Sequence, residues 1–423
     1  MAVVGVAWRL CLGGRRAVAL EPPSSRAAAD GRRYDVSACP TRVVPGAWGF
    51  LAQLNEGRAT KKRATEFTMD RVVQPFDASK FNFRKAAISE ALVAFVPETR
   101  AAPGADASSA PRVLPPAAPL AAVAADVAAA GGGPNLVIIN VSPIDYGHVL
   151  LVPRVLAGLP QALDVGSVLL ALQFARELGG AAFRVGYNSL GAFATINHLH
   201  FQSYYMPLTM PVERAATEIL SGALGRPALP GAAAALPALG KRRRDSADGG
   251  AAVPSYGGGE QQANGLSYKS NAVRVSRLLD YPVNAFVVEL EAAAAAAGVG
   301  GAAAALAAPG GLEAVAAVVG AAAQRMQDAN QPFNLLISEG GARVFVFPQR
   351  YAERQAAGLV SAELLDTGVN PAAFEIAGHI LLKRPEDYEA ASEGWAGRLL
   401  AEVSLEEDRF LEVADLCFGV RGC

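Results

Sequence analysis

The stretch from residue 135 to residue 205 constrains the fold most, because short strand-like runs alternate there with one helix-like run. Two apolar runs rich in β-branched residues, "NLVIINV" (135–141) and "HVLLVP" (148–153), flank the turn-forming "SPIDYG". They predict a β-hairpin buried on at least one face. Helical spacing follows in "DVGSVLLALQFAREL" (164–178), with Asp164 as the N-cap, and then a strand, a glycine-containing loop and a strand in 183–205. This order predicts an α+β fold with an antiparallel sheet.

Three segments rich in Ala, Gly and Pro interrupt the chain, at residues 101–133, 221–263 and 291–310. Such compositions cannot bury enough apolar surface to offset chain entropy, so we expect disordered insertions. Residues 1–33 are Arg-rich and acid-poor, which is typical of a disordered extension or a transit peptide. Between these segments we expect an N-terminal catalytic lobe at 34–220 and a C-terminal lobe at 264–423.

A faint internal repeat supports two tandem lobes. "NLVIINVSPIDYGHVLLVPR" (135–154) and "NLLISEGGARVFVFPQR" (334–350) share a strand, a glycine-bearing turn, a second strand, and then Pro and a basic residue. A gene-duplicated fold would give such a pattern. In the second copy Arg343 falls near the place of His148, and no His-x-His follows. We therefore expect the C-terminal lobe to be degenerate.

Charge and cysteine content exclude several classes of protein. The formal net charge of the 423 residues is −1, which gives no indication of a nucleic-acid or membrane-surface partner. The four cysteines are scattered and form no CxxC pair, which fits a reducing compartment. No window is apolar enough to predict a membrane span. We expect a cytoplasmic protein, and the basic run 241–244 leaves a nuclear location open.

The chain has four histidines, and two of them lie one residue apart in "NHLHFQ" (197–202). Residues i, i+2 and i+4 of a strand project from one face. His198, His200 and Gln202 are therefore predicted to lie side by side, with Leu199 and Phe201 pointing into the core.

Three interpretations of the row formed by His198, His200 and Gln202 remain open. Two imidazoles on a strand can ligate zinc, but a third ligand at a helpful local spacing is absent, so no metal site is assigned. The histidines can also serve only as hydrogen-bonding groups on a sheet face. In the third interpretation, a neutral imidazole attacks a phosphate ester and forms a phosphoramidate, which splits one difficult displacement into two easier ones.

Nucleophilic attack by an imidazole requires a fixed tautomer and donors for the nonbridging phosphate oxygens. The loop before the histidines can supply such donors. They are the Asn188 amide, the Ser189 and Thr195 hydroxyls, and backbone N–H groups around Gly191, where no side chain blocks a close approach.

The combination of "GHVLLVPR" and "HLHFQ" resembles the nucleotidyl-transferase branch of the histidine-triad superfamily. Longer blocks resemble the GDP-L-galactose phosphorylase family of plants and algae. Among these blocks are "VQPFDASKFNF", "INVSPIDYGHVLLVPRVL", "FRVGYNSLGAFATINHLHFQSYY" and "LLDTGVNPAAFEIAGHILLKRPEDYEAASE". They lie within residues 34–100, 134–210 and 268–418. The resemblance implies a histidine-triad-like antiparallel sheet with helices.

The resemblance also implies a reaction. GDP-L-galactose and inorganic phosphate would give L-galactose 1-phosphate and GDP, a step toward ascorbate, with no cofactor. Alternatives are a GDP-glucose phosphorylase or a GDP-hexose hydrolase on the same scaffold. A nucleotide-binding regulatory protein without turnover is a further alternative, and the wider transferase family suggests a homodimer.

The family pattern implies the roles of single residues. His200 would be the nucleophile that carries GMP, and the Gln202 amide would hold an oxygen of that intermediate. Related hydrolases have a histidine in place of Gln202, so this glutamine favours transfer to phosphate. His198 would support the site by hydrogen bonding. His148 matches the superfamily's upstream histidine, and Asn188 its phosphate-contacting asparagine.

Several basic residues, one further histidine and an aromatic motif complete the sequence expectations. Arg58, Lys61, Lys62, Arg63, Arg84 and Lys85 could contact phosphates or lie on a solvated face. His379 is as compatible with a core position as with the site. "FNF" (81–83) is a candidate for guanine contact.

Overall fold

A computed structural model of the chain describes residues 17–19, most of 36–95, 134–178 except residue 146, 182–220, 273–291 and 310–420. The predicted insertions at 101–133 and 221–263 lie outside the described residues, as does nearly all of 291–310. Of the predicted extension 1–33, only the strand Ala17–Ala19 is described. Among the described helices, none is long and apolar enough to cross a bilayer.

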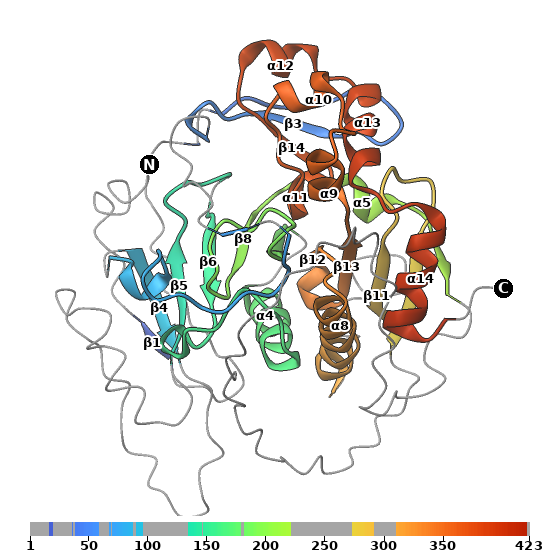
Figure 1. The fold of residues 1–423 in the computed structure, drawn as a ribbon. Coiled ribbons are helices and arrows are strands. Elements are labelled where there is room, and N and C mark those ends of the chain that lie inside the picture. Colours follow the sequence, from blue (N-terminus) through green and yellow to red (C-terminus); the bar gives the residue numbers. More distant parts are fainter. Residues whose placement is uncertain are drawn as a thin grey trace, which may run out of the picture.

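A large sheet spans the centre of the described chain in the order β1-β4-β5-β6-β8-β7-β12-β13-β11-β10-β9 (Figure 1). Every pairing in it is antiparallel, so the predicted α+β class is confirmed. The strands are β1 (Ala17–Ala19), β4 (Ala91–Phe95), β5 (Asn135–Ile139), β6 (Val149–Val152), β7 (Phe183–Asn188), β8 (Phe201–Tyr205), β9 (Thr217–Ile219), β10 (Val273–Leu278), β11 (Phe286–Leu290), β12 (Phe333–Ser338) and β13 (Arg343–Pro348).

Two long helices cover one face of this sheet, α4 (Val165–Leu178) and α8 (Gly311–Asp328), which lie side by side (Figure 1). Helix α14 (Glu407–Phe418) packs against α8. The predicted N-cap is confirmed, because the Asp164 carboxylate accepts a hydrogen bond from the Ser167 N–H at 2.6 Å. A Cβ on Gly320 would lie 2.7 Å from the Val165 side chain, so this glycine permits the close approach of the two helices.

A smaller sheet and short helices, together called the cap, cover part of the opposite, open face (Figure 1). The cap sheet has the order β14-β3-β2 and pairs the N-terminal segment with the C-terminal one. The cap consists of β2 (Thr41–Val43), β3 (Leu51–Leu54), α9 (Tyr351–Ala356), α10 (Ala362–Asp366), α11 (Ala373–Ile376), β14 (His379–Leu382), α12 (Pro385–Ala390) and α13 (Glu393–Val403). The cap therefore draws on both predicted lobes.

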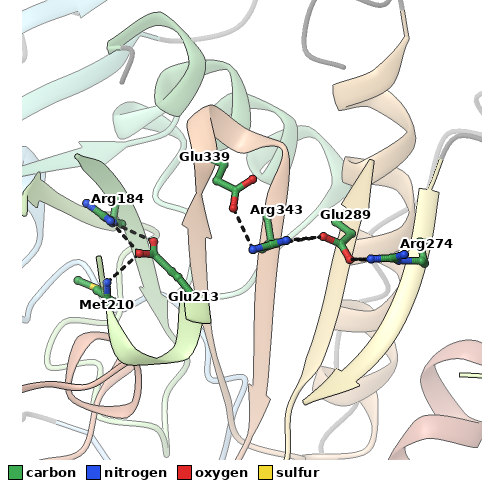
Figure 2. A network of polar contacts seen from close by, with 7 residues as sticks. All are labelled: Arg184, Met210, Glu213, Arg274, Glu289, Glu339 and Arg343. Carbon is green, nitrogen blue, oxygen red and sulfur yellow. Dashed lines mark hydrogen bonds and ion pairs between the residues drawn. The ribbon is translucent and has the colours of Figure 1, made fainter. Parts of the chain in front are cut away.

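The helix α5 (Pro211–Arg214) connects the open face to the cap. Figure 2 shows Glu213 of this helix paired with Arg184 of β7 and accepting from the Met210 N–H. Both charged side chains are almost fully buried, at 4% and 7% exposure. Loss of one partner would leave an uncompensated buried charge, so this pair fixes α5 firmly on the sheet. Short 3₁₀ turns occur at Phe83–Lys85, Val155–Ala157 and Glu339–Gly341.

The described sheet contains two copies of one unit. β5, β6, α4, β7 and β8 recur as β10, β11, α8, β12 and β13, and the two copies meet at the antiparallel pair β7–β12. Two tandem lobes are therefore present, but the register of the predicted repeat is wrong. Residues 334–350 form the counterpart of β7–β8, whereas the counterpart of 135–154 is β10–β11.

This misalignment arose because every short hairpin has the same pattern of apolar run, turn and apolar run. When β7 is aligned with β12 residue by residue and the β7–β8 register is continued by two residues, Arg343 falls at the position of His200, and not at that of His148. Phe345 stands at the position of Gln202 by the same registers. The second lobe thus lacks both the imidazole and the amide of the first.

Candidate active site

The row predicted on one face of the sheet lies at the N-terminal end of β8. His200 and Gln202 line a cavity on the open face, whereas Leu199 and Phe201 are buried in the core beneath α4 and α8. The alternation of cavity-facing and core-facing side chains thus includes Leu199 and His200, which precede the first residue of β8. The cavity, of about 120 Å³, adjoins a hollow of about 470 Å³, and both are lined by Phe81, Thr195 and Ile196.

The tautomer of His200 is fixed by two acceptors. Its Nδ1 lies 2.8 Å from the carbonyl oxygen of His198 and 3.0 Å from Oε1 of Gln161. Since neither oxygen can donate, Nδ1 must carry the proton. The lone pair is then on Nε2, the ring atom with which a histidine held in this way can attack an electrophile.

Burial keeps the His200 ring neutral. The side chain is 5% exposed, and this desolvation lowers its pKa to about 4, although the hydrogen bond to the His198 carbonyl acts in the opposite direction. Desolvation disfavours the charged form of an imidazole, so the ring is unprotonated at Nε2 throughout the physiological range. A neutral, oriented imidazole at a cavity wall is suited to nucleophilic attack.

Gln161 is a central residue of the site that the sequence did not reveal. It is 1% exposed, and its Oε1 accepts from the His200 N–H at 2.9 Å as well as from the ring. Its Nε2 donates to the carbonyl oxygens of Asn188 (2.9 Å) and His200 (3.1 Å). One side chain therefore ties the end of β7 to the start of β8 and holds the imidazole between them.

His198 acts through its backbone and its packing. It is fully buried between the rings of Phe76 and Phe83, does not line the cavity, and accepts the Phe83 N–H on Nδ1 at 3.0 Å. Burial lowers its pKa to about 3, so its ring is neutral too. The expected supporting hydrogen bond is made by its carbonyl oxygen to the His200 ring.

His148 lies behind Gln202 and outside the cavity lining. Its Nδ1 accepts from the Ile144 N–H at 2.8 Å, so the proton of the neutral ring is on Nε2. The ring hydrogen-bonds the side chain of Gln202, and Nε2 lies 3.0 Å from the Asn140 amide nitrogen. Burial holds the pKa of His148 well below its usual value.

Asn188, at the end of β7, lines the cavity and is oriented from two sides. Its Oδ1 accepts from Nδ2 of Asn334 in the second lobe (2.7 Å) and from the Ala373 N–H in the cap (3.0 Å). Asn334 is oriented in turn by a hydrogen bond from Gln349 to its own amide oxygen. With Oδ1 engaged in this way, the NH₂ group of Asn188 is the part available to a ligand.

The remaining predicted phosphate contacts divide into two groups. Thr195 lines the cavity. Ser189 does not, because its fully buried hydroxyl accepts from the Phe333 N–H at 3.0 Å and donates to the Leu190 carbonyl at 3.1 Å. Gly191 adopts a φ of 77°, which a glycine permits in a tight loop, but it also lies outside the cavity lining. The structure thus brings Asn188 and Thr195, but not these two residues, to His200.

Of the basic residues considered from the sequence, Arg58 lines the cavity. Arg84 instead donates to the Val155 and Leu156 carbonyl groups, and Lys85 to those of Ser79 and Lys80. Residues 61–63 lie outside the described residues. Within the described part of the chain, no three His, Cys, Asp or Glu side chains are grouped so as to hold a metal ion.

His379 belongs to the core of the cap. It is fully buried on β14, and its Nδ1 lies 2.8 Å from the Tyr204 hydroxyl. Burial lowers its pKa to about 3. Tyr204 follows Gln202 on the same face of β8, and its ring lies 4.3 Å from that of Phe374 in α11. The contact between His379 and Tyr204 thus connects β14 of the cap to β8.

Comparisons with known proteins agree with a two-lobed organisation. Models described as "GDPGP1-like, N-terminal domain" and "GDPGP1-like, C-terminal domain" match residues 24–204 and 260–423. The chain is therefore a tandem protein of the GDPGP1-like class.

Similar proteins define the family more closely. The chain is 44% identical over 390 residues to GDP-L-galactose phosphorylase 2 of Arabidopsis thaliana. This alignment covers 92% of this chain and 72% of that protein. It is 42% identical over 391 residues to GDP-L-galactose phosphorylase 1 of the same plant (92% and 70%). The chain belongs to the GDP-L-galactose phosphorylase family.

Two more distant similarities complete the comparison. Human GDP-D-glucose phosphorylase 1 is 37% identical over 188 residues, or 44% of this chain and 42% of that protein. The crystal structure of yeast Ap4A phosphorylase Apa2 in complex with Ap4A aligns with a TM-score of 0.45 and 12% identity, over 91% of this chain and 98% of that one.

Proposed function

We propose that the protein is a GDP-L-galactose phosphorylase, which transfers GMP to inorganic phosphate and gives L-galactose 1-phosphate and GDP in ascorbate biosynthesis. The observation that carries this proposal is His200, a neutral imidazole at a cavity wall whose Nδ1–H is held by two acceptors. Among the described residues, Cys39 and Cys417 form no disulfide, which fits the reducing cytoplasm in which we place the reaction.

The reaction proceeds in two displacements. Nε2 of His200 attacks the α-phosphorus of GDP-L-galactose, and the bond from this phosphorus to the bridging oxygen breaks. L-galactose 1-phosphate leaves with the bonding electron pair, and GMP remains on the ring. An oxygen of inorganic phosphate then attacks the same phosphorus and displaces the histidine, which gives GDP. Throughout, the Nδ1 proton stays on the ring and stabilises its positive charge through the His198 carbonyl.

Three side chains of the cavity wall meet the nonbridging oxygens of the α-phosphate. They are the side-chain amide of Gln202, the NH₂ of Asn188 and the hydroxyl of Thr195. Donors that are already oriented lower the barrier, because no reorganisation is needed when charge develops. The amide of Gln202 cannot act as the acid–base group that a third histidine provides in related hydrolases, which favours phosphate over water as the acceptor.

A GDP-D-glucose phosphorylase is the second candidate, since human GDP-D-glucose phosphorylase 1 shares the N-terminal part of this chain at 37% identity. Rates measured with several GDP-hexoses would separate these substrates. Product formation that does not depend on phosphate would indicate a hydrolase. Binding of GDP-hexose without turnover would indicate a regulatory protein.

The decisive test of the nucleophile is covalent labelling. Purified protein incubated with GDP-L-galactose labelled in the guanosine moiety should acquire GMP, and addition of phosphate should release GDP. His200→Asn should abolish both labelling and turnover. His379→Asn is the matched control, because it replaces an equally buried histidine by a residue that can still accept from Tyr204. Turnover by folded His200→Asn protein would refute the assignment.

A further inference from the structure

The cavity beside His200 has two chemically different ends, and each end belongs to a different hydrophobic cluster. One end, here called the aromatic end, is lined by Phe81, Phe83, Ile138, Leu150 and Ile196. The other, here called the cap end, is lined by Arg58, Phe193, Asn370, Phe374 and Glu375.

The two ends lie on opposite sides of the phosphate-binding groups. Along β8, His200 packs against Phe83 at 5.1 Å between ring centroids, Gln202 follows, and Tyr204 packs against Phe374 at 4.3 Å. A substrate whose α-phosphate lies at His200 and Gln202 must therefore extend toward both ends. Its flat base matches the aromatic end, because apolar and aromatic walls bury a ring system well. The leaving hexose phosphate is then directed to the cap end.

Polar side chains of the cap end match a hexose phosphate. Glu375 is 6% exposed and is carried by α11, whose Ala373 N–H is bonded to Asn188. A carboxylate can accept hydrogen bonds from two adjacent hydroxyls, and an amide such as Asn370 can donate to one and accept from another. Arg58 supplies positive charge for a phosphate, and it also lines a smaller adjoining hollow with Asn370 and Glu375.

Phe193, which also lines the cap end, has an unusual backbone conformation that indicates a ligand-binding role. Its φ is 70°, in the left-handed region that bulky residues rarely adopt, and its ring packs against Tyr351 of the cap at 5.6 Å. Such outliers persist only where surrounding structure holds them, and they cluster at ligand sites. Aromatic rings are common partners for the C–H faces of sugars, since those faces are apolar.

We propose that the cap end is the hexose subsite, in which Glu375 and Asn370 bind the sugar hydroxyls and Arg58 binds the phosphate that leaves with the hexose. This inference rests on the proposed function. It makes α11 of the cap the element that selects the sugar, whereas β8 carries the transfer chemistry. The same Arg58 would bind inorganic phosphate in the second displacement, because that phosphate must approach from the side the leaving group has vacated.

A pair of reactions tests the role of Glu375. Phosphorolysis of GDP-L-galactose needs the hexose subsite, whereas exchange of radioactive phosphate into GDP passes through the same guanylyl-His200 without any hexose. Glu375→Gln should lower kcat/KM for phosphorolysis by about 10- to 100-fold, because charge-assisted hydrogen bonds to the sugar are lost. The phosphate–GDP exchange rate should stay within about twofold. Glu389→Gln, an exposed glutamate of α12, is the control and should change neither reaction.

The outcomes separate this inference from the proposed function. An equal fall of both reactions in folded Glu375→Gln protein would overturn the inference, since Glu375 would then contact the guanine or support the common machinery. Unchanged phosphorolysis would also overturn it. If Glu375→Gln does not fold, the same two reactions are measured with Asn370→Ala, which should likewise lower phosphorolysis and leave the exchange rate unchanged. A wild-type protein with neither exchange nor phosphorolysis would instead overturn the proposed function.

Discussion

Replacement of Gln161 by methionine tests whether this residue orients His200, the proposed nucleophile. Methionine has nearly the same length but offers no strong acceptor or donor. The substitution would leave three buried groups without their partner, namely the His200 N–H and the carbonyls of Asn188 and His200. Each buried unsatisfied group costs about 1–3 kcal/mol, so the free energy of unfolding should fall by at least about 3 kcal/mol.

The same substitution should also slow catalysis. In Gln161→Met, the His200 ring would keep one acceptor, the His198 carbonyl, and would lose the second. Removal of the group that orients a functional histidine typically costs about 10- to 100-fold in activity. We expect a loss of this size in the single-turnover rate of guanylylation, measured at a temperature where circular dichroism shows the variant to be folded.

Gln327→Met provides a matched control. Gln327 is also buried, and it bonds the N–H and carbonyl of Leu163, two residues from Gln161, at 2.6 and 3.1 Å. It makes no contact with His200 among the described interactions. This variant should lose stability but keep the guanylylation rate within about twofold. Equal rates for the two folded variants, or a wild-type rate in Gln161→Met, would refute the orienting role.

Two further predictions concern charge. The His200 pKa of about 4 predicts that kcat/KM is constant above pH 5 and falls as the pH drops through that pKa, since protonation removes the attacking lone pair. A decrease of kcat/KM that begins near pH 6.5 would contradict the conclusion that burial lowers this pKa. Arg343→Met removes one of two arginines that pair with the fully buried Glu289 (Figure 2). The free energy of unfolding, measured by urea titration, should fall by about 2–4 kcal/mol. The rate of guanylylation of His200 should be unchanged.

Local sequence rules predicted the parts of the site that depend on strand period alone. Because side chains alternate along an extended chain, the open-face position of His200 and Gln202 and the core position of Phe201 followed from spacing. The hairpin at 135–153 and the Asp164 cap are likewise local features, and the structure contains both. The resemblance to known phosphorylases supplied the reaction, which spacing could not.

Contacts between distant segments could not be predicted in this way. Gln161 lies 39 positions before His200 in a loop without regular spacing, and a buried amide gives no periodic signal. Ser189 was expected to face the phosphate, but pairing of β7 with β12 draws its hydroxyl to Phe333. Glu375 reaches the cavity because β14 pairs with β3 across more than 300 positions.

The second lobe lacks the histidine row, yet it is part of the site. At the position of His200 it carries Arg343, which joins Glu339, Glu289 and Arg274 in a network of ion pairs (Figure 2). Its strand β12 borders β7, and Asn334 of β12 fixes the amide of Asn188. The first lobe alone would leave that amide free to rotate. In the proposed mechanism, the first lobe supplies the nucleophile His200, and the second lobe, with the cap, orients the Asn188 amide that would meet the phosphate.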